Sequence, residues 1–202
     1  MKIYRSVIIV LLVLVLTGCG STELEERCFP MLVAVGYEDR QVSFDIAYPK
    51  DSGVLQSSAK GADFAQSMEQ YEGRLNKQID YNHLRVLVFE DEFLKSSNGY
   101  SAMLDHLALR ESFPRNTYVC IVDDVDELME LEKKLSQDLG TYLEEYLKQH
   151  EEKKDKLLTL GDLIDEKGNR NMIYYMPYIE VEDEYIEWNG YMNTKGKIWK
   201  DF

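Results

Sequence analysis

The stretch Pro-Met-Leu-Val-Ala-Val-Gly-Tyr, residues 30–37, decides the fold of this chain. It is almost continuously apolar, as is typical of a strand that is covered on both faces. A second run, Leu-Arg-Val-Leu-Val-Phe at residues 84–89, has the same character. Because such strands lie side by side in sheets with helices on both faces, we expect Met31–Val35 and Val86–Phe89 to be buried neighbours.

The next strand along the chain alternates and predicts a hairpin. Over residues 42–48 one face takes Val42, Phe44, Ile46 and Tyr48, and the other takes Ser43, Asp45 and Ala47. Four polar residues, 38–41, separate this run from the first, which is the spacing of a β-hairpin. Pro49 ends the second strand, and residues 50–60 form a Ser/Lys/Gly loop.

Helical and extended segments alternate through the rest of the chain. Apolar spacing predicts helices over 62–75 and 100–110, a helical turn over 90–94 and a fourth strand over 117–122. Asp123 and Asp124 are placed to cap a helix. Its leucine stripe extends through Leu139, Gly140 interrupts it, and a second segment continues to Leu147.

The last third predicts an exposed charged link over 148–157 and a short helix over 158–164. Extended segments follow over 172–180 and 185–192, with a further strand beginning at 197–199. The whole order predicts an α/β fold: a mixed β-sheet packed with helices, opening on an N-terminal β-hairpin.

A short apolar run near the N-terminus has the pattern of an export signal. Lys2 and Arg5 precede the run Val7–Leu16, which as a helix would reach about 15 Å, too short to cross a bilayer. Thr17-Gly18 and Cys19 follow it. This order resembles a bacterial lipoprotein signal peptide. The resemblance implies cleavage after residue 18 and a diacylglycerol on Cys19; the alternative is an ordinary secretory signal with an incidental cysteine.

The chain is acidic, with a net charge of −14 over 202 residues. Loss of residues 1–18, which hold two basic residues and no acid, leaves 184 residues at −16. That charge argues against nucleic acid as a partner and against a body that lies flat on anionic lipid. We expect residues 19–27 to form a short tether, lipidated as the signal-peptide resemblance implies, and residues 28–202 to form the α/β domain.

Side chains that would support catalysis are not grouped in the sequence. His83, His106 and His150 are far apart and lack metal-ligand spacing. Cys28 and Cys120 both lie in apolar stretches, so we expect two buried thiols, with a disulfide as the alternative. No nucleophile elbow or phosphate-binding glycine loop occurs. We therefore predict no catalytic residue, no metal, no cofactor and no enzyme activity.

Two C-terminal features have a structural and a functional interpretation. The acidic run 180–184 lacks the spacing of a calcium loop and is expected to be a solvated edge rather than a cation site. Six aromatic residues are expected to be core and strand-pair residues rather than the lining of a ligand cleft. They are Tyr174, Tyr175, Tyr178, Tyr185, Trp188 and Tyr191.

Several short motifs occur in a familiar order. They are Glu25-Glu26-Arg27, the strand that ends at Gly36, Ala47-Tyr48-Pro49-Lys50, Leu84–Phe89, Phe113-Pro114-Arg115-Asn116, Thr117-Tyr118-Val119, Tyr142–Leu147, Thr159-Leu160-Gly161-Asp162, Met176–Glu182 and Ile186–Tyr191. As a set they resemble the N-terminal domain of the Ger(x)C family, the lipoprotein C-subunits of spore germination receptors. The resemblance covers most of the chain after Cys19.

The resemblance implies a function through protein contact. It places the protein on the outer face of the cell membrane, which is the spore inner membrane in this family. It implies integral-membrane A- and B-type receptor subunits as partners and no catalysis. Here Gly20 stands where the family usually has Trp after the lipidated cysteine. Family members continue through two further domains. The first of these, which is the second domain of the family, is expected to start within residues 184–202.

Two other classes of function are compatible with a lipid-anchored domain. One is a stand-alone surface lipoprotein that binds a solute for a transporter, and the other is a lipid-tethered hydrolase. The missing catalytic constellation disfavours the hydrolase. Neighbouring genes for multi-spanning germination subunits would favour the receptor, whereas a permease and an ATPase would favour the solute binder.

Overall fold

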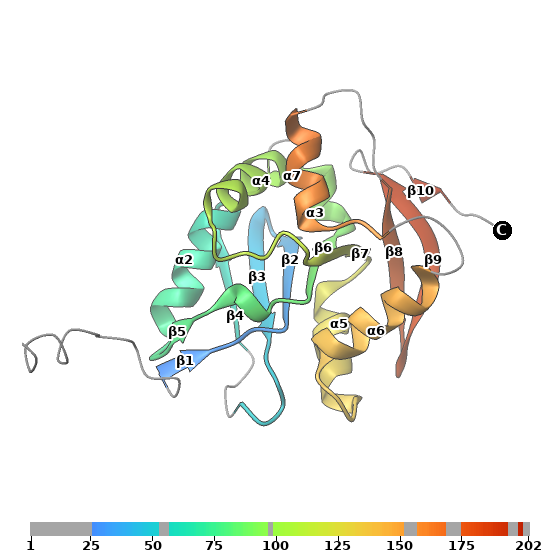
Figure 1. The fold of residues 1–202 in the computed structure, drawn as a ribbon, viewed down its shortest axis with the longest axis horizontal. Helices are drawn as coiled ribbons and strands as arrows, with labels where there is room; N and C mark the ends of the chain where they lie inside the picture. Colours follow the sequence, from blue (N-terminus) through green and yellow to red (C-terminus); the bar gives the residue numbers. More distant parts are fainter. Residues whose placement is uncertain are drawn as a thin grey trace, which may run out of the picture.

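A central sheet of eight strands organises the chain in the computed structural model (Figure 1). The structure describes residues 26–52, 57–96, 99–151, 157–168, 175–193 and 198–199. The predicted signal peptide and Cys19 lie outside these residues, as do 172–174 and 197 of the predicted strands. The strand order is β10-β9-β8-β7-β6-β2-β3-β4, and β1 and β5 form a separate two-stranded sheet.

The strands have the following bounds: β1 Arg27–Cys28, β2 Leu32–Glu38, β3 Gln41–Ala47, β4 Ser57–Gly61, β5 Gln78–Ile79, β6 Val86–Glu90, β7 Tyr118–Val122, β8 Tyr175–Glu182, β9 Tyr185–Asn193 and β10 Ile198–Trp199. The helices are α2 Phe64–Arg74, the 3₁₀ helix η2 Tyr81–His83, α3 Asp91–Lys95, α4 Gly99–Leu109, α5 Val125–Lys134, α6 Leu139–Glu151 and α7 Leu160–Gly168.

The two apolar runs that predicted the fold are adjacent central strands. β2 and β6 pair in parallel, from Leu32 opposite Val86 to Val35 opposite Phe89. These paired side chains are fully buried. β7 and β8 continue the parallel part, and antiparallel strands flank it on both sides. The predicted mixed α/β sheet is confirmed.

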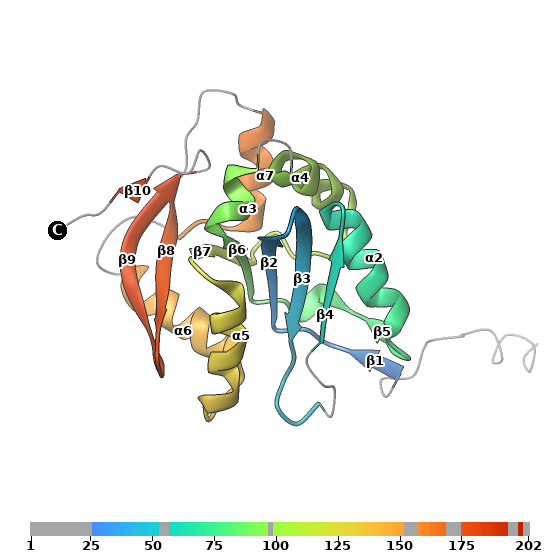
Figure 2. The ribbon, with the colours of Figure 1, turned by 180° about the vertical axis from the view of Figure 1, so that it is seen from behind.

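Helices cover both faces of this sheet, as the continuous apolar strands predict. On one face α2, α3, α4 and α7 pack on side chains such as Val33, Phe44 and Phe89. On the other face α5 and α6 pack on Ala34 and Val88. Figure 2 shows the two groups of helices from behind, on either side of the strands. Alternate residues of one strand thus enter two separate cores.

The N-terminal hairpin is confirmed, with a tighter turn than the four polar residues suggested. Glu38 pairs with Gln41, so only Asp39 and Arg40 form the loop. Both have positive φ, 51° and 64°. Two residues in this region are what a type I′ turn requires, and that turn matches the twist of the two strands.

Several element boundaries differ from the sequence-based prediction. Residues 57–60, expected in a loop, belong to edge strand β4, which pairs with β3. Their Ser-Ser-Ala-Lys composition has little strand propensity, so tertiary pairing decides their conformation. Arg27, expected in the tether, pairs with Gln78 in β1–β5 and forms an ion pair with Asp80 at 3.3 Å.

Gly140 does not interrupt a helix, contrary to the prediction. α5 ends at Lys134, and α6 includes Gly140 in its first turn. A Cβ at this position would lie 2.6 Å from the backbone of Met31, so the glycine allows α6 to approach the chain just before β2. α6 also extends to Glu151 and takes in residues 148–151 of the predicted link.

Residues 157–160 carry the chain from one face of the sheet to the other. The N–H of Val119 donates to the carbonyl of Leu158 at 3.1 Å, and the N–H of Leu160 donates to that of Thr117 at 2.8 Å. This segment pairs with the start of β7, and β8 pairs with the end of β7, at Ile121 and Val122. Within the described ranges, no helix combines the length and apolar character needed to cross a bilayer.

Candidate functional site

Acidic residues gather where the parallel strands end. β2 ends at Glu38, β6 ends at Glu90 and passes directly into α3, and Asp123 and Asp124 follow β7. In open α/β sheets the carboxyl ends of the strands are the usual place for ligands, because loops and helix starts surround a hollow there. In this protein the same edge forms a cavity of about 330 Å³.

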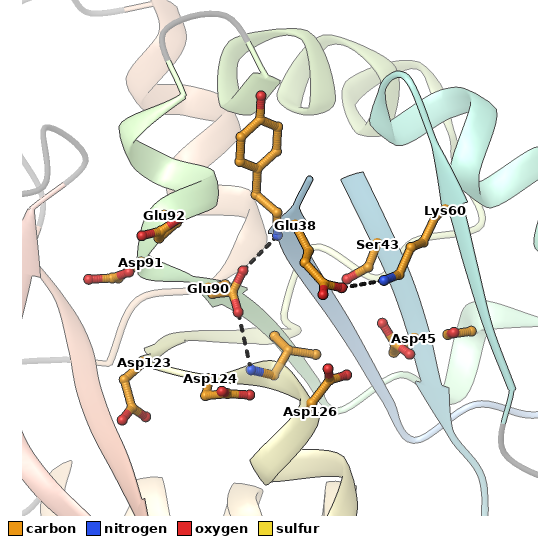
Figure 3. A pocket seen from close by; sticks show the side chains of 13 residues that line it. Glu38, Ser43, Asp45, Lys60, Glu90, Asp91, Glu92, Asp123, Asp124 and Asp126 are labelled. Atoms are coloured by element: carbon orange, nitrogen blue, oxygen red, sulfur yellow. Dashed lines mark hydrogen bonds and ion pairs between the residues drawn. The ribbon is translucent and has the colours of Figure 1, made fainter. Parts of the chain in front are cut away.

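The cavity is bounded by α5, by strands β3 and β4 and by the start of α3 (Figure 3). Lys60 is the one basic residue among the described residues that line it, beside eight carboxylates. Those acids are Glu38, Asp45, Glu90, Asp91, Glu92, Asp123, Asp124 and Asp126. Their joint field is strongly negative, so the cavity repels anions and attracts cations.

Glu90 links two of the segments that line the cavity through hydrogen bonds. Its Oε2 accepts a hydrogen bond from the N–H of Tyr37 at 2.6 Å, and its Oε1 accepts from the N–H of Val125 at 3.5 Å. The end of β2 and the first turn of α5 are therefore joined through one side chain. Burial raises the pKa of Glu90, and these two backbone donors oppose that rise.

Gly36 is required by the close approach of Glu90 to the hairpin. The N–H of Gly36 donates to Ser43 Oγ at 3.2 Å. A Cβ on Gly36 would lie 2.6 Å from that oxygen and 3.2 Å from Glu90 Oε2. A side chain there would force the Ser43 hydroxyl, and to a smaller extent the Glu90 carboxylate, to move.

Six of the eight carboxylates have partners within the protein, among them Asp123, which accepts backbone N–H groups that include that of Val181, and Asp45, which accepts from Ser43. Glu90 accepts the two backbone N–H groups, and Glu38 forms an ion pair with Lys60. Asp91 pairs with Lys95 at 2.7 Å, and Asp124 caps α5 by accepting from the N–H of Glu127 at 3.0 Å. Part of the negative charge in the cavity therefore has a structural role, because these carboxylates join strands to helices and cap helix ends.

Asp45 is different, because it is buried and incompletely bonded. It lies on β3 opposite Ala34, is only 6% exposed and lines the cavity. Its Oδ2 has no hydrogen-bond partner among the described residues. Burial raises its pKa from 3.8 to about 7; a hydrogen bond from Ser43 and the charge of Lys60 oppose the rise, and Asp126 and Glu90 add to it.

The chemistry of this site is acceptance of hydrogen bonds by fixed carboxylates. Among the described side chains, no three His, Cys, Asp or Glu residues converge closely enough to hold a metal ion. Among the described residues, the lining contains Ser43, Ser58 and Tyr37 but no histidine or cysteine.

The histidines and cysteines singled out in the sequence are dispersed. His83, His106 and His150 lie in η2, α4 and α6. Cys28 and Cys120 are buried free thiols in the cores on opposite faces of the sheet, as predicted, and burial raises the pKa of both.

The C-terminal aromatic residues that the structure describes differ in burial and in packing. Tyr178 is buried, whereas Tyr175 and Tyr185 are 40% and 56% exposed. Trp188 stacks on His150, with ring centroids 4.9 Å apart, and Tyr191 meets Trp188 edge-on. Tyr174 lies outside the described residues. The acidic run 180–184 comprises the end of β8 and the turn into β9; residues 182–184 are exposed, as predicted, whereas Glu180 and Val181 are half-buried.

Sequence reasoning missed the acidic cavity, although a signal for it exists. Acidic residues follow three predicted strands directly, at Glu38, Glu90 and Asp123. Because these strands prove to be parallel, their ends meet at one edge. Asp45 gave no such signal, since an alternating strand is expected to carry polar side chains on a solvated face.

The model of a family described as "Spore germination protein N-terminal domain" matches residues 20–181. The chain belongs to this family. The match confirms the resemblance to the Ger(x)C germination C-subunits that the motifs indicated. Strands β9 and β10 continue the sheet beyond residue 181, where the match ends.

One solved structure, titled "Crystal Structure of the GerBC protein", is similar to this spore germination domain. The TM-score is 0.39 at 12% sequence identity, over 83% of this chain and 50% of that chain. The chain therefore spans half the length of that protein. No curated protein sequence matches the chain.

Proposed function

We propose that this protein serves a spore germination receptor as its C-type subunit, anchored by lipid on Cys19 and acting by contact with integral-membrane A- and B-type subunits. The observation that carries the proposal is the family match over residues 20–181. The match fits the resemblance stated from the motifs. We propose no catalytic step for this subunit, in keeping with the dispersed histidines and the buried thiols.

The proposed anchor restricts where such contacts can lie. The described domain begins with Glu26 and its first strand at Arg27, so seven residues separate that strand from Cys19. Fully extended, seven residues reach about 25 Å. A domain on so short a tether stays beside the bilayer, on the outer face of the membrane, where integral subunits are within reach.

Deletion of the gene in a spore-forming host tests the germination role. We expect normal sporulation and a slower release of dipicolinate when nutrients are added. Release at the parental rate with every nutrient would contradict the proposal, unless the lipidated chain co-purifies with an A- or B-type subunit, which would indicate redundancy. The protein from the complemented strain provides the material for that co-purification.

Replacement of the predicted lipidated cysteine tests the anchor separately. We expect Cys19→Ala to lose metabolic palmitate label and to leave the membrane fraction, because two acyl chains give stable attachment. Cys28→Ala is the matched control, since it removes a cysteine that lies inside the fold. Equal membrane retention of both variants would contradict lipidation at Cys19.

A stand-alone lipoprotein that binds a solute is the second candidate function. The acidic cavity at the strand ends is the observation that favours it. It differs from the receptor proposal in its partners, a permease and an ATPase instead of germination subunits. The co-purification experiment separates the two.

A further inference from the structure

The acidic cavity has a buried acceptor for which no described residue supplies a donor. Five of its eight carboxylates are engaged by Lys60, Lys95 or backbone N–H groups, and Asp45 accepts one hydrogen bond from Ser43. Asp45 Oδ2 is buried without a hydrogen bond to any described residue. Buried polar atoms in folded proteins nearly always have a partner, so an exception of this kind points to a missing ligand.

Asp126 faces the same part of the cavity as Asp45. It comes from the first turn of α5, whereas Asp45 comes from β3, and Figure 3 shows the two carboxylates on neighbouring sides of the hollow. Asp126 is exposed, and its charge contributes to the raised pKa of Asp45. Two carboxylates that repel each other gain when a cation lies between them.

We propose that this cavity binds an alkylammonium group, with Asp45 and Asp126 accepting its N–H hydrogen bonds. An ammonium group has three donors and no acceptor, which complements a lining of carboxylates. A volume of about 330 Å³ lies in the range of sites for small organic ligands. The described acids do not converge as ligands of a bare metal ion must.

The alkylammonium group has two sources, a free amine or the lysine side chain of a partner protein. Both present the same chemistry to Asp45. The inference is independent of the germination role, because it rests on the cavity alone.

Isothermal titration of the full chain in non-ionic detergent tests the proposal. The probes are n-butylammonium, 1,4-diaminobutane and Nα-acetyl-lysine N-methylamide, each as the chloride at constant ionic strength. Tetramethylammonium is the matched control ligand for n-butylammonium and the lysine derivative, since it has their single charge and no N–H donor. Calcium and magnesium chloride complete the set.

We expect saturable binding of the N–H cations and binding at least tenfold weaker in Asp45→Asn and in Asp126→Asn. Asp126 is exposed, so its variant keeps the fold. Glu69→Gln removes one exposed charge from α2, on the other face of the sheet, and is expected to bind as the parent does. Tighter binding of n-butylammonium than of the lysine derivative, which carries the same single charge, would indicate a free amine, and the reverse order would indicate a side chain.

Three results would overturn the proposal. Equal binding of tetramethylammonium would mean that the cavity attracts cations by charge alone, without a site that accepts N–H hydrogen bonds. Tighter binding of calcium or magnesium would mean a metal site. Unchanged affinity in Asp45→Asn and Asp126→Asn would place any ammonium site elsewhere on the protein.

Discussion

Asp45→Asn is expected to stabilise the protein in a way that depends on pH. Asparagine has nearly the shape of aspartate but carries no charge at any pH. In the parent, the buried carboxyl has its pKa raised to about 7, so above that pH the fold must hold a charge with little water around it. The variant removes that cost.

The sign and size follow from the difference in proton binding. Between pH 3.8 and about pH 7, Asp45 keeps its proton in the folded state and loses it in the unfolded state. The free energy of unfolding therefore falls as the pH rises through this window. The full rise in pKa corresponds to about 4 kcal/mol at about 1.4 kcal/mol per pH unit. Roughly half of it, about 2 kcal/mol, is lost between about pH 5.5 and about pH 8.

The groups that face Asp45 remain in both proteins. They are Ser43 on β3, Lys60 on β4, Glu90 at the end of β6 and Asp126 on α5. Other acids with raised pKa, such as Glu132, are also present in both. The difference in unfolding free energy between variant and parent therefore isolates Asp45.

Urea unfolding followed by far-ultraviolet circular dichroism at several pH values measures that difference. We expect the advantage of Asp45→Asn to grow by about 2 kcal/mol from about pH 5.5 to about pH 8. Glu69→Gln is the control, and its difference from the parent is expected to stay constant. An Asp45→Asn difference that is constant with pH, or that shrinks as the pH rises, would refute the argument that this carboxyl is buried without compensation.

The other stability predictions concern packing and are measured in the same urea assay. Gly140→Ala is expected to lower the free energy of unfolding by about 1–3 kcal/mol, because its Cβ would meet the backbone of Met31. Gly73→Ala in α2, which has open space around it, is the control and is expected to raise it by about 0.5–1 kcal/mol. Equal effects of the two substitutions would mean that α6 does not contact Met31 closely. Val33→Asp is expected to cost several kcal/mol because the side chain is fully buried in an apolar core, and a midpoint close to that of the parent would mean that β2 is exposed.

Local patterns in the sequence were sufficient to predict whether most segments form a helix or a strand. The continuous apolar runs of β2 and β6 predict burial on both faces, because a half-exposed strand would place alternate Val and Leu side chains in water. The capping role of Asp124 could also be predicted, because the cap depends only on residues of the helix that it precedes. The hairpin and the leucine stripes of the helices are local in the same sense.

The boundaries that went wrong depend on distant residues. Ser57–Gly61 is a strand because the exposed edge of β3 offers backbone partners, and its composition does not reveal this. Gly140 marks a close contact with Met31, more than a hundred residues away, and not the end of a helix. A glycine in a sequence does not tell which of these needs it serves.

The candidate site belongs almost entirely to the tertiary structure. The sequence by itself determined an acidic α/β domain with strands that end in carboxylates and with cysteines in apolar runs. Only the fold decided that the ends of β2, β6 and β7 meet at one edge and that α5 covers Asp45. Strand order and helix placement arise from long-range packing, and the pKa of a carboxyl follows from what that packing leaves around it.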